Sequence, residues 1–117
     1  MNLPTHIKIF DSDYAIKYFD AYVEVDPSHR ELMEGCMDYE LSEIRIYRNQ
    51  RGYSDILETI LHEALHAIGQ KLNVECLKND DTKSDAVVDI IAVAMNTILV
   101  DNAHIWESKI QETIIDV

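Results

Sequence analysis

The sequence predicts an α+β fold class, because segments typical of short strands come first and segments typical of long helices follow. Before residue 50, short segments alternate apolar and polar residues. After it, two long segments repeat their apolar residues at helical spacing. A chain of 117 residues can bury one hydrophobic core, so we expect a single domain over residues 1–117. A hydrophobic content of 47% is that of a globular protein.

The first half of the chain contains three predicted strands. They cover residues 6–10, residues 36–40 and Glu43–Tyr47, and a tight turn joins the last two. The isoleucines of Glu43–Tyr47 are expected to point to the core, because alternate residues of a strand face opposite ways. Residues 14–25 fit a strand by their aromatic content and a helix by the spacing of their apolar residues, so both remain open.

A helix is predicted from Ser54 or Asp55 to Gly69 or Asn73. Either of the first two residues can cap its start, and its apolar residues recur at helical spacing. These residues form one stripe: Ile56, Leu57, Ile60, Leu61, Ala64, Leu65, Ile68 and Leu72. We therefore expect one side of this helix to pack on the core.

The same helix carries the pattern His-Glu-x-x-His, with His62, Glu63 and His66. Histidines four apart lie on one face of a helix, so His62 and His66 can direct two imidazoles at one Zn²⁺ ion. Glu63 is turned round the helix from them and is the candidate general base toward a water on the metal. The alternative is a chance occurrence of the pattern on a solvated face, and the apolar stripe beside the histidines argues against it.

A second helix is predicted over residues 83–100 and is expected to be buried, because it is apolar almost all round. Asp85 and Asp89 lie four apart on it, and carboxylates in a buried helix need a metal or hydrogen-bond donors. We expect Asp85 to be the third protein ligand. Asp89 is expected to accept a ring N–H of a ligating histidine, or to replace Asp85 as the ligand. The alternative for Asp85 is an acidic residue favoured by the dipole at a helix N-terminus.

The formal net charge of −12, from 22 acidic and 10 basic residues, argues against nucleic acid and anionic membrane surfaces as partners. Cys36 and Cys76 form no CxxC pair and are too few for a disulfide scaffold. The first residues lack the pattern of a signal peptide, and no apolar run is long enough for a membrane span. A cytoplasmic protein with two ordinary thiols is therefore expected.

The motif and the acidic residue that follows it resemble the gluzincin arrangement of zinc metallopeptidases. Over about residues 6–102 the chain is similar to small metallopeptidase-like proteins encoded by phages and prophages. The third gluzincin ligand is usually glutamate, whereas this chain has the shorter Asp85. The metzincin pattern needs a histidine where this chain has Leu72, so it does not fit.

The resemblance implies a zincin-like architecture, in which a small antiparallel or mixed sheet packs on the motif helix and a second buried helix lies behind. It implies a zinc-dependent peptidase in which His62, His66 and Asp85 hold Zn²⁺ and Glu63 is the general base. A peptide or protein substrate, with or without a larger protein partner, is expected along a sheet edge at Glu43–Tyr47. Two alternatives remain: a zinc-binding phage or prophage protein that acts by protein–protein interaction without catalysis, and a small domain without metal.

Overall fold

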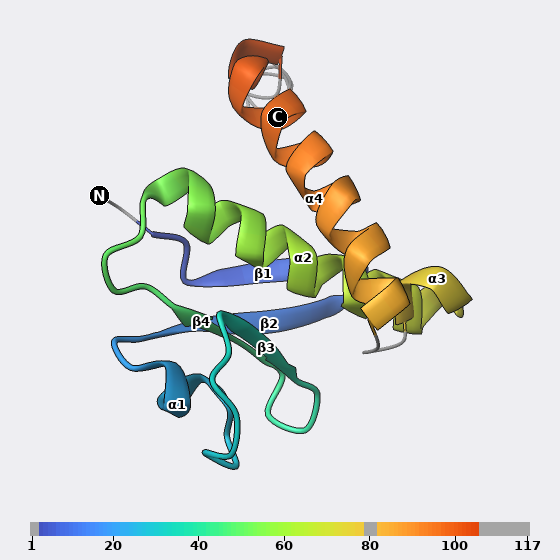
Figure 1. Ribbon diagram of the computed structural model, residues 1–117. Coiled ribbons are helices and arrows are strands. Elements are labelled where there is room, and N and C mark those ends of the chain that lie inside the picture. The colour runs from blue at the N-terminus through green and yellow to red at the C-terminus, as the bar shows by residue number, and fades with distance from the viewer. Residues whose placement is uncertain (1–2, 79–81, 106–117) are drawn as a thin grey trace.

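The sheet has four strands: β1 (His6–Ile9), β2 (Ser12–Phe19), β3 (Gly35–Asp38) and β4 (Glu43–Tyr47). Their order across the sheet is β1-β2-β4-β3 (Figure 1). β2 is antiparallel to β1 and parallel to β4, and β3 is antiparallel to β4. The computed structural model describes residues 3–78 and 82–105 of the chain. The predicted α+β class is confirmed, and the sheet is mixed.

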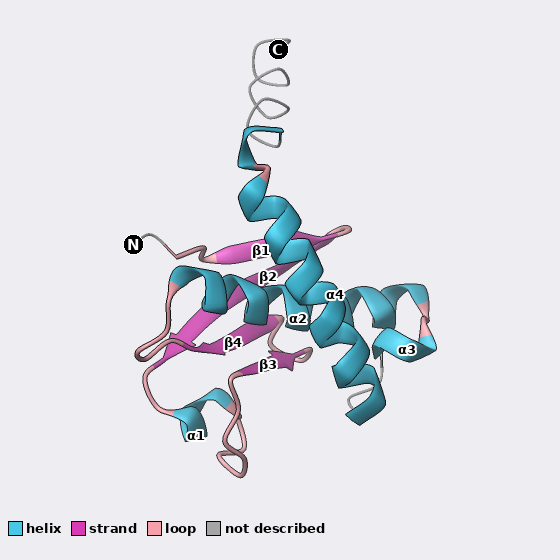
Figure 2. Ribbon diagram, turned by 45° about the horizontal axis from the view of Figure 1, so that its top comes forward, coloured by secondary structure: helices cyan, strands magenta, loops and turns pink. Residues whose placement is uncertain are grey.

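Two long helices, α2 (Tyr53–Leu72) and α4 (Thr82–Asp101), form the other layers. α2 lies across one face of the sheet, and α4 crosses α2 (Figure 1, Figure 2). The short helix α1 (Tyr22–Val25) contacts β2 and β4, and α3 (Glu75–Lys78) contacts both long helices. Both long helices were predicted, α4 within one residue of its observed bounds. Of the two ends predicted for α2, Asn73 is one residue and Gly69 three residues from the observed end at Leu72.

The segment at residues 14–25, which the sequence left open, contains both structures. Its first part belongs to β2, and α1 follows from Tyr22. The strand predicted at residues 36–40 is shorter and ends at Asp38. The parallel pairing of β2 with β4 puts Ile16 beside Ile44 in the middle of the sheet.

The core lies between the sheet and α2. Ile44 and Ile46 are fully buried, as predicted for the inward face of β4, and they pack with Ile56 and Ile60 of α2. Burying one such side chain contributes about 1.5–3 kcal/mol, so this contact determines which side of α2 faces the sheet. The histidines of the motif point away from this contact, because at 100° per residue His66 lies about 120° and His62 about 160° round the helix from Ile60.

The opposite face of β4 holds α1 through Arg45. Its Nε donates a hydrogen bond to the carbonyl of Val25 at 2.8 Å, and its Nη2 donates to the carbonyl of Glu24 at 2.8 Å. The guanidinium also lies 4.3 Å from the centre of the Phe19 ring. Arg45 thereby satisfies carbonyls at the end of a helix too short to be stable by itself.

β4 is an inner strand, with β2 on one side and β3 on the other. The expectation that a substrate would lie along Glu43–Tyr47 is therefore wrong, because both edges of this strand are already hydrogen-bonded. The sheet edges are β1 and β3, and β3 is the edge strand beside the motif side of α2. The sequence did not predict this order, since residues 12–19 were not recognised as one long strand that separates β1 from β4.

α4 is not buried all round, so this part of the prediction is wrong. Among the described elements, α2 and α3 make its main contacts and cover one stripe of its surface. The buried residues of that stripe are Ser84, Val88, Ala92 and Asn96. On other sides the helix is open to solvent, with Ile90 71% exposed and Ile98 54% exposed. Among the described helices, none combines the length and apolar character that crossing a membrane requires.

The start of α2 is held by α4. α2 begins at Tyr53 without a side-chain cap, so the predicted capping by Ser54 or Asp55 is wrong. Instead Asn96 Nδ2 donates to the Ser54 carbonyl at 3.2 Å and to Ser54 Oγ at 3.0 Å. This contact joins the start of α2 to the second half of α4, so it helps to set the register between the two helices.

The loop between α1 and β3 is organised by Asp26. Its Oδ1 accepts hydrogen bonds from the backbone N–H and hydroxyl of Ser28, and its Oδ2 accepts from the N–H groups of Arg30 and Glu31. The bonds from Ser28 are the main cause that lowers the pKa of Asp26 to about 2, because they stabilise the carboxylate form. The Asp26 carboxylate thus shapes the loop that leads to the edge strand.

We predict that Asp26 contributes to stability above about pH 4, and that the contribution is lost as the pH falls toward 2. The pKa is lower in the folded state than in the unfolded state, so the folded state binds protons less readily and loses stability on acidification. Asp26→Asn should lower the urea midpoint at pH 7, and the difference from wild type should shrink between pH 4 and pH 2. Asp13→Asn, an exposed change in β2, is the control. A difference that stays constant with pH would contradict the prediction.

Candidate metal centre

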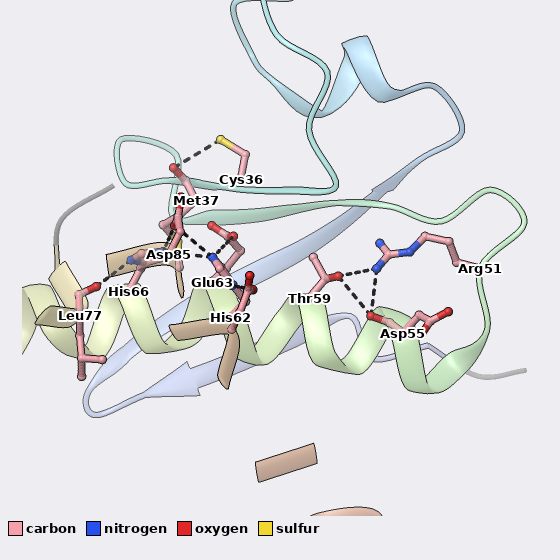
Figure 3. A network of polar contacts seen from close by, with 11 residues as sticks. Cys36, Met37, Arg51, Asp55, Thr59, His62, Glu63, His66, Leu77 and Asp85 are labelled. Atoms are coloured by element: carbon pink, nitrogen blue, oxygen red, sulfur yellow. Dashed lines mark hydrogen bonds and ion pairs between the residues drawn. The ribbon is translucent and has the colours of Figure 1, made fainter. Parts of the chain in front are cut away.

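Three side chains from α2 and α4 meet at one point (Figure 3). His62 Nε2 and His66 Nε2 lie 3.1 Å apart. Asp85 Oδ1 lies 3.0 Å from His66 Nε2 and 3.4 Å from His62 Nε2. The two histidines come from successive turns of α2, and Asp85 comes from the first turn of α4.

The opposite nitrogen of each ring is held by an acceptor. His66 Nδ1 is 2.7 Å from the carbonyl of Leu77, and His62 Nδ1 is 2.7 Å from Asp89 Oδ1. A carbonyl and a carboxylate can only accept, so each Nδ1 carries the hydrogen. In a neutral imidazole the other nitrogen then has a lone pair, and both Nε2 lone pairs are available at the meeting point with Asp85.

This cluster fits a divalent metal ion. Its three atoms are all acceptors, and one proton can bridge only one of the three pairs, whereas a cation contacts all three atoms. A tetrahedral ion with bonds of 2.0–2.1 Å places its ligand atoms about 3.3 Å apart, which matches the separations of 3.0–3.4 Å. Two imidazoles and one carboxylate suit zinc and other first-row divalent ions.

Asp85 and Asp89 lie in different positions relative to the histidines. Asp85 is at the meeting point, whereas Asp89 contacts the outer nitrogen of His62, where it orients the ring. Their side chains are 43% and 69% exposed, so the argument that they are costly buried charges is wrong. The position of Asp85 in the first turn of α4 also suits the helix dipole, so that alternative is compatible with the cluster.

Glu63 lies beside the cluster on the side of β3. Its Oε2 is 3.9 Å from His62 Nε2, farther than the oxygen of Asp85, and its side chain is 11% exposed. A Cβ on Gly35 would lie 2.6 Å from Thr59 Cγ2 and 3.3 Å from Glu63 Cγ. β3 can therefore approach α2 this closely only because residue 35 has no side chain.

A cleft of about 560 Å³ runs past the cluster between β3, α2 and α4. Its walls include His62, Glu63, His66, Asp85, Asp89, Gly35, Cys36 and Met37. Burial and then the charge of Glu63 raise the pKa of the Cys36 thiol to about 11, so it is protonated near neutral pH. Within the described residues, neither Cys36 nor Cys76 belongs to the metal-ligand cluster.

The orientation of His66 depends on two residues that the sequence analysis missed. A Cβ on Gly69 would lie 2.6 Å from Leu77 Cβ and 2.7 Å from Lys78 N, so α3 packs directly on the backbone of α2. This contact brings the Leu77 carbonyl to His66 Nδ1. A glycine inside a helix lowers the stability of the helix by about 1 kcal/mol relative to alanine. A glycine at this position therefore indicates that another segment packs closely on the helix, and the sequence analysis could have used this signal.

No protein-family model, curated protein or solved structure matches this chain. The resemblance to gluzincins therefore stays a prediction. It rests on His62, Glu63 and His66 in the sequence and on the acidic residue that follows them. The fit to a metal ion rests on the geometry of the cluster.

We predict that Gly69→Ala weakens zinc binding about 10–100-fold, the usual effect of losing a group that orients a metal ligand. The new methyl group should displace α3 and remove the Leu77 carbonyl from His66. Affinity can be measured by competition with a chromophoric chelator. Gly52→Ala is the matched control, since its Cβ would meet nothing within 4 Å. Equal affinities for Gly69→Ala and wild type would show that α3 does not orient His66.

Proposed function

We propose that this protein is a zincin-like, zinc-dependent metallopeptidase that hydrolyses peptide bonds. The observation that carries the proposal is the convergence of His62 Nε2, His66 Nε2 and Asp85 Oδ1, with the Glu63 carboxylate beside them in the same cleft. Three protein ligands leave a fourth position of a tetrahedral ion for water or substrate, which is typical of catalytic zinc sites.

Each residue around the centre has a distinct role in this proposal. His62, His66 and Asp85 hold the ion, and Asp89 keeps the His62 ring in the tautomer that presents Nε2. Zinc bound there supplies a Lewis acid that acidifies water and polarises the substrate carbonyl. All other steps fall to side chains and backbone groups of the chain.

Glu63 acts as the general base and then as the general acid. Its carboxylate takes a proton from the attacking water, and it later gives that proton to the nitrogen of the leaving amine. The distance of 3.9 Å to His62 Nε2 supports this role, because the carboxylate is near the centre without being one of its three ligand atoms. Its small exposed fraction keeps bulk water from competing for the proton.

The substrate is a polypeptide that extends the sheet at β3. β3 pairs with β4 on one side, and within the described residues no strand pairs with its other side. An extended peptide can add there through backbone hydrogen bonds, as an additional strand. Gly35, Cys36 and Met37 also form part of the cleft wall, so such a peptide would pass beside Glu63.

We predict that Glu63→Gln lowers peptide hydrolysis about 10²–10⁴-fold while zinc stays bound, because an amide cannot carry the proton. Cleavage can be measured by mass spectrometry on a broad peptide mixture, and zinc content by elemental analysis. Glu40→Gln, in the turn before β4, is the control and should leave both unchanged. If zinc-loaded wild type cleaves no peptide, a zinc-binding protein without catalysis is the correct interpretation.

We predict that adding zinc raises the melting temperature of wild type, and that Asp85→Ala abolishes the rise. Zinc at about 100 times its Kd stabilises the folded state by about 2.7 kcal/mol if it binds only that state. Asp89→Ala should weaken binding less than Asp85→Ala, since it removes the group that orients His62 and keeps the three ligands. Asp13→Ala should behave as wild type. A zinc response that survives Asp85→Ala would exclude Asp85 as a ligand.

A further inference from the structure

The outer side of α4 carries a regular stripe of four apolar residues and one threonine. This outer stripe is defined here as Ala86, Ile90, Val93, Thr97 and Val100. These residues are spaced alternately four and three apart, the repeat by which two helices pack as a coiled coil. All five are exposed, with Ile90 71%, Val93 47% and Val100 52% accessible. From Ile90 to Val100 the chain has no charged residue, although its formal net charge is −12.

The outer stripe faces away from the side of α4 that packs on α2. At 100° per residue, the middle of the buried stripe that includes Val88 and Ala92 lies about 140° round the helix from the middle of the outer stripe. In Figure 1 and Figure 2, one end of α4 extends beyond the sheet and α2. Nothing within the described residues covers the outer stripe, and contiguous exposed apolar groups are typical of contact surfaces.

We propose that the outer stripe binds the same stripe of a second copy of this chain, with the two α4 helices antiparallel. The charges at the ends of α4 favour this occupant and this direction. Lys83 and Asp101 lie on the same flank of the stripe, at opposite ends of the helix. An antiparallel pair brings Lys83 of each copy to Asp101 of the other, and it also opposes the two helix dipoles. A parallel pair would place like charges level with one another.

The stripe is complementary to itself in this arrangement. With Val93 of one copy against Val93 of the other, Ile90 meets Thr97 and Ala86 meets Val100. Lys83 and Asp101 of the other copy then come level to within about 3 Å along the axis. The contact runs along a helix of 20 residues, or about 30 Å.

The proposed pairing uses none of the residues of the candidate metal centre. Asp85 and Asp89 point to His62 and His66. At 100° per residue they lie about 100° and 60° round α4 from the middle of the outer stripe, so neither belongs to it. The pairing is therefore expected with or without zinc.

Sedimentation equilibrium of the full chain tests the proposal, with zinc and with chelator. Wild type should be a dimer at micromolar concentration, and Ile90→Glu should raise the dimer Kd at least about 100-fold, because a buried glutamate would have no partner. Ile98→Glu is the matched control: Ile98 is also an exposed isoleucine of α4 but lies off the stripe, so the dimer should persist. Circular dichroism should be the same for all three proteins.

A charge exchange tests the direction without altering the apolar contact. Each single variant, Lys83→Glu or Asp101→Lys, should weaken the dimer. Each gives residue 83 of one copy the same charge as residue 101 of the other, at both ends of the pair. The double variant should restore it, because the two opposite charges are only exchanged. Restoration would not occur in a parallel pair, and its absence would overturn the antiparallel arrangement. A wild type that stays monomeric at 100 µM, or a dimer that resists Ile90→Glu, would overturn the proposal as a whole.

Discussion

Three atoms that can accept hydrogen bonds, on His62, His66 and Asp85, face one another where α2 and α4 meet. His62 and His66 present Nε2 to Asp85 because their Nδ1 atoms already donate elsewhere. Such an arrangement is repulsive unless positive charge lies among the three atoms, and a divalent cation supplies it. In the proposed metal site, binding of the ion and docking of α4 would be coupled, since the third ligand arrives only when α4 lies on α2. The apolar cluster around Leu65 that joins the helices elsewhere is small.

Two close backbone approaches determine the geometry on either side of this junction. Gly35 lets the edge strand approach the side chains of Thr59 and Glu63, and Gly69 lets α3 approach the backbone of α2. The first contact sets the wall of the cleft beside the proposed general base. The second sets the ring of His66 through a carbonyl that an added methyl group would push away. The proposed catalytic arrangement therefore depends on the absence of side chains at residues 35 and 69 as well as on the side chains of the cluster.

The residues of the centre could be predicted from sequence because helical periodicity is a local property. Two histidines four apart share a face wherever the helix lies, and Asp85 is the acid that the next helix offers first. The sheet edge could not be predicted, because strand order depends on pairing between distant segments. The Leu77 carbonyl could not be predicted either, since a backbone group has no identity in the sequence. The position of Gly69 inside a helix indicated a close approach of another segment, but nothing in the sequence indicated that this segment is α3.

α4 explains why apolar composition alone was a poor guide to burial. A helix that is apolar all round is buried only when the chain has enough elements to surround it. In the part of the chain that the structure describes, the main contacts of α4 are with α2 and α3. Its surface therefore divides into three strips: one on α2, one with the aspartates at the histidines, and one facing outward. The aspartates lie at the border of the packed strip, where a carboxylate keeps some water and still reaches a ring nitrogen. Full burial would have made those charges costly. Partial exposure keeps both carboxylates hydrated when no cation is bound.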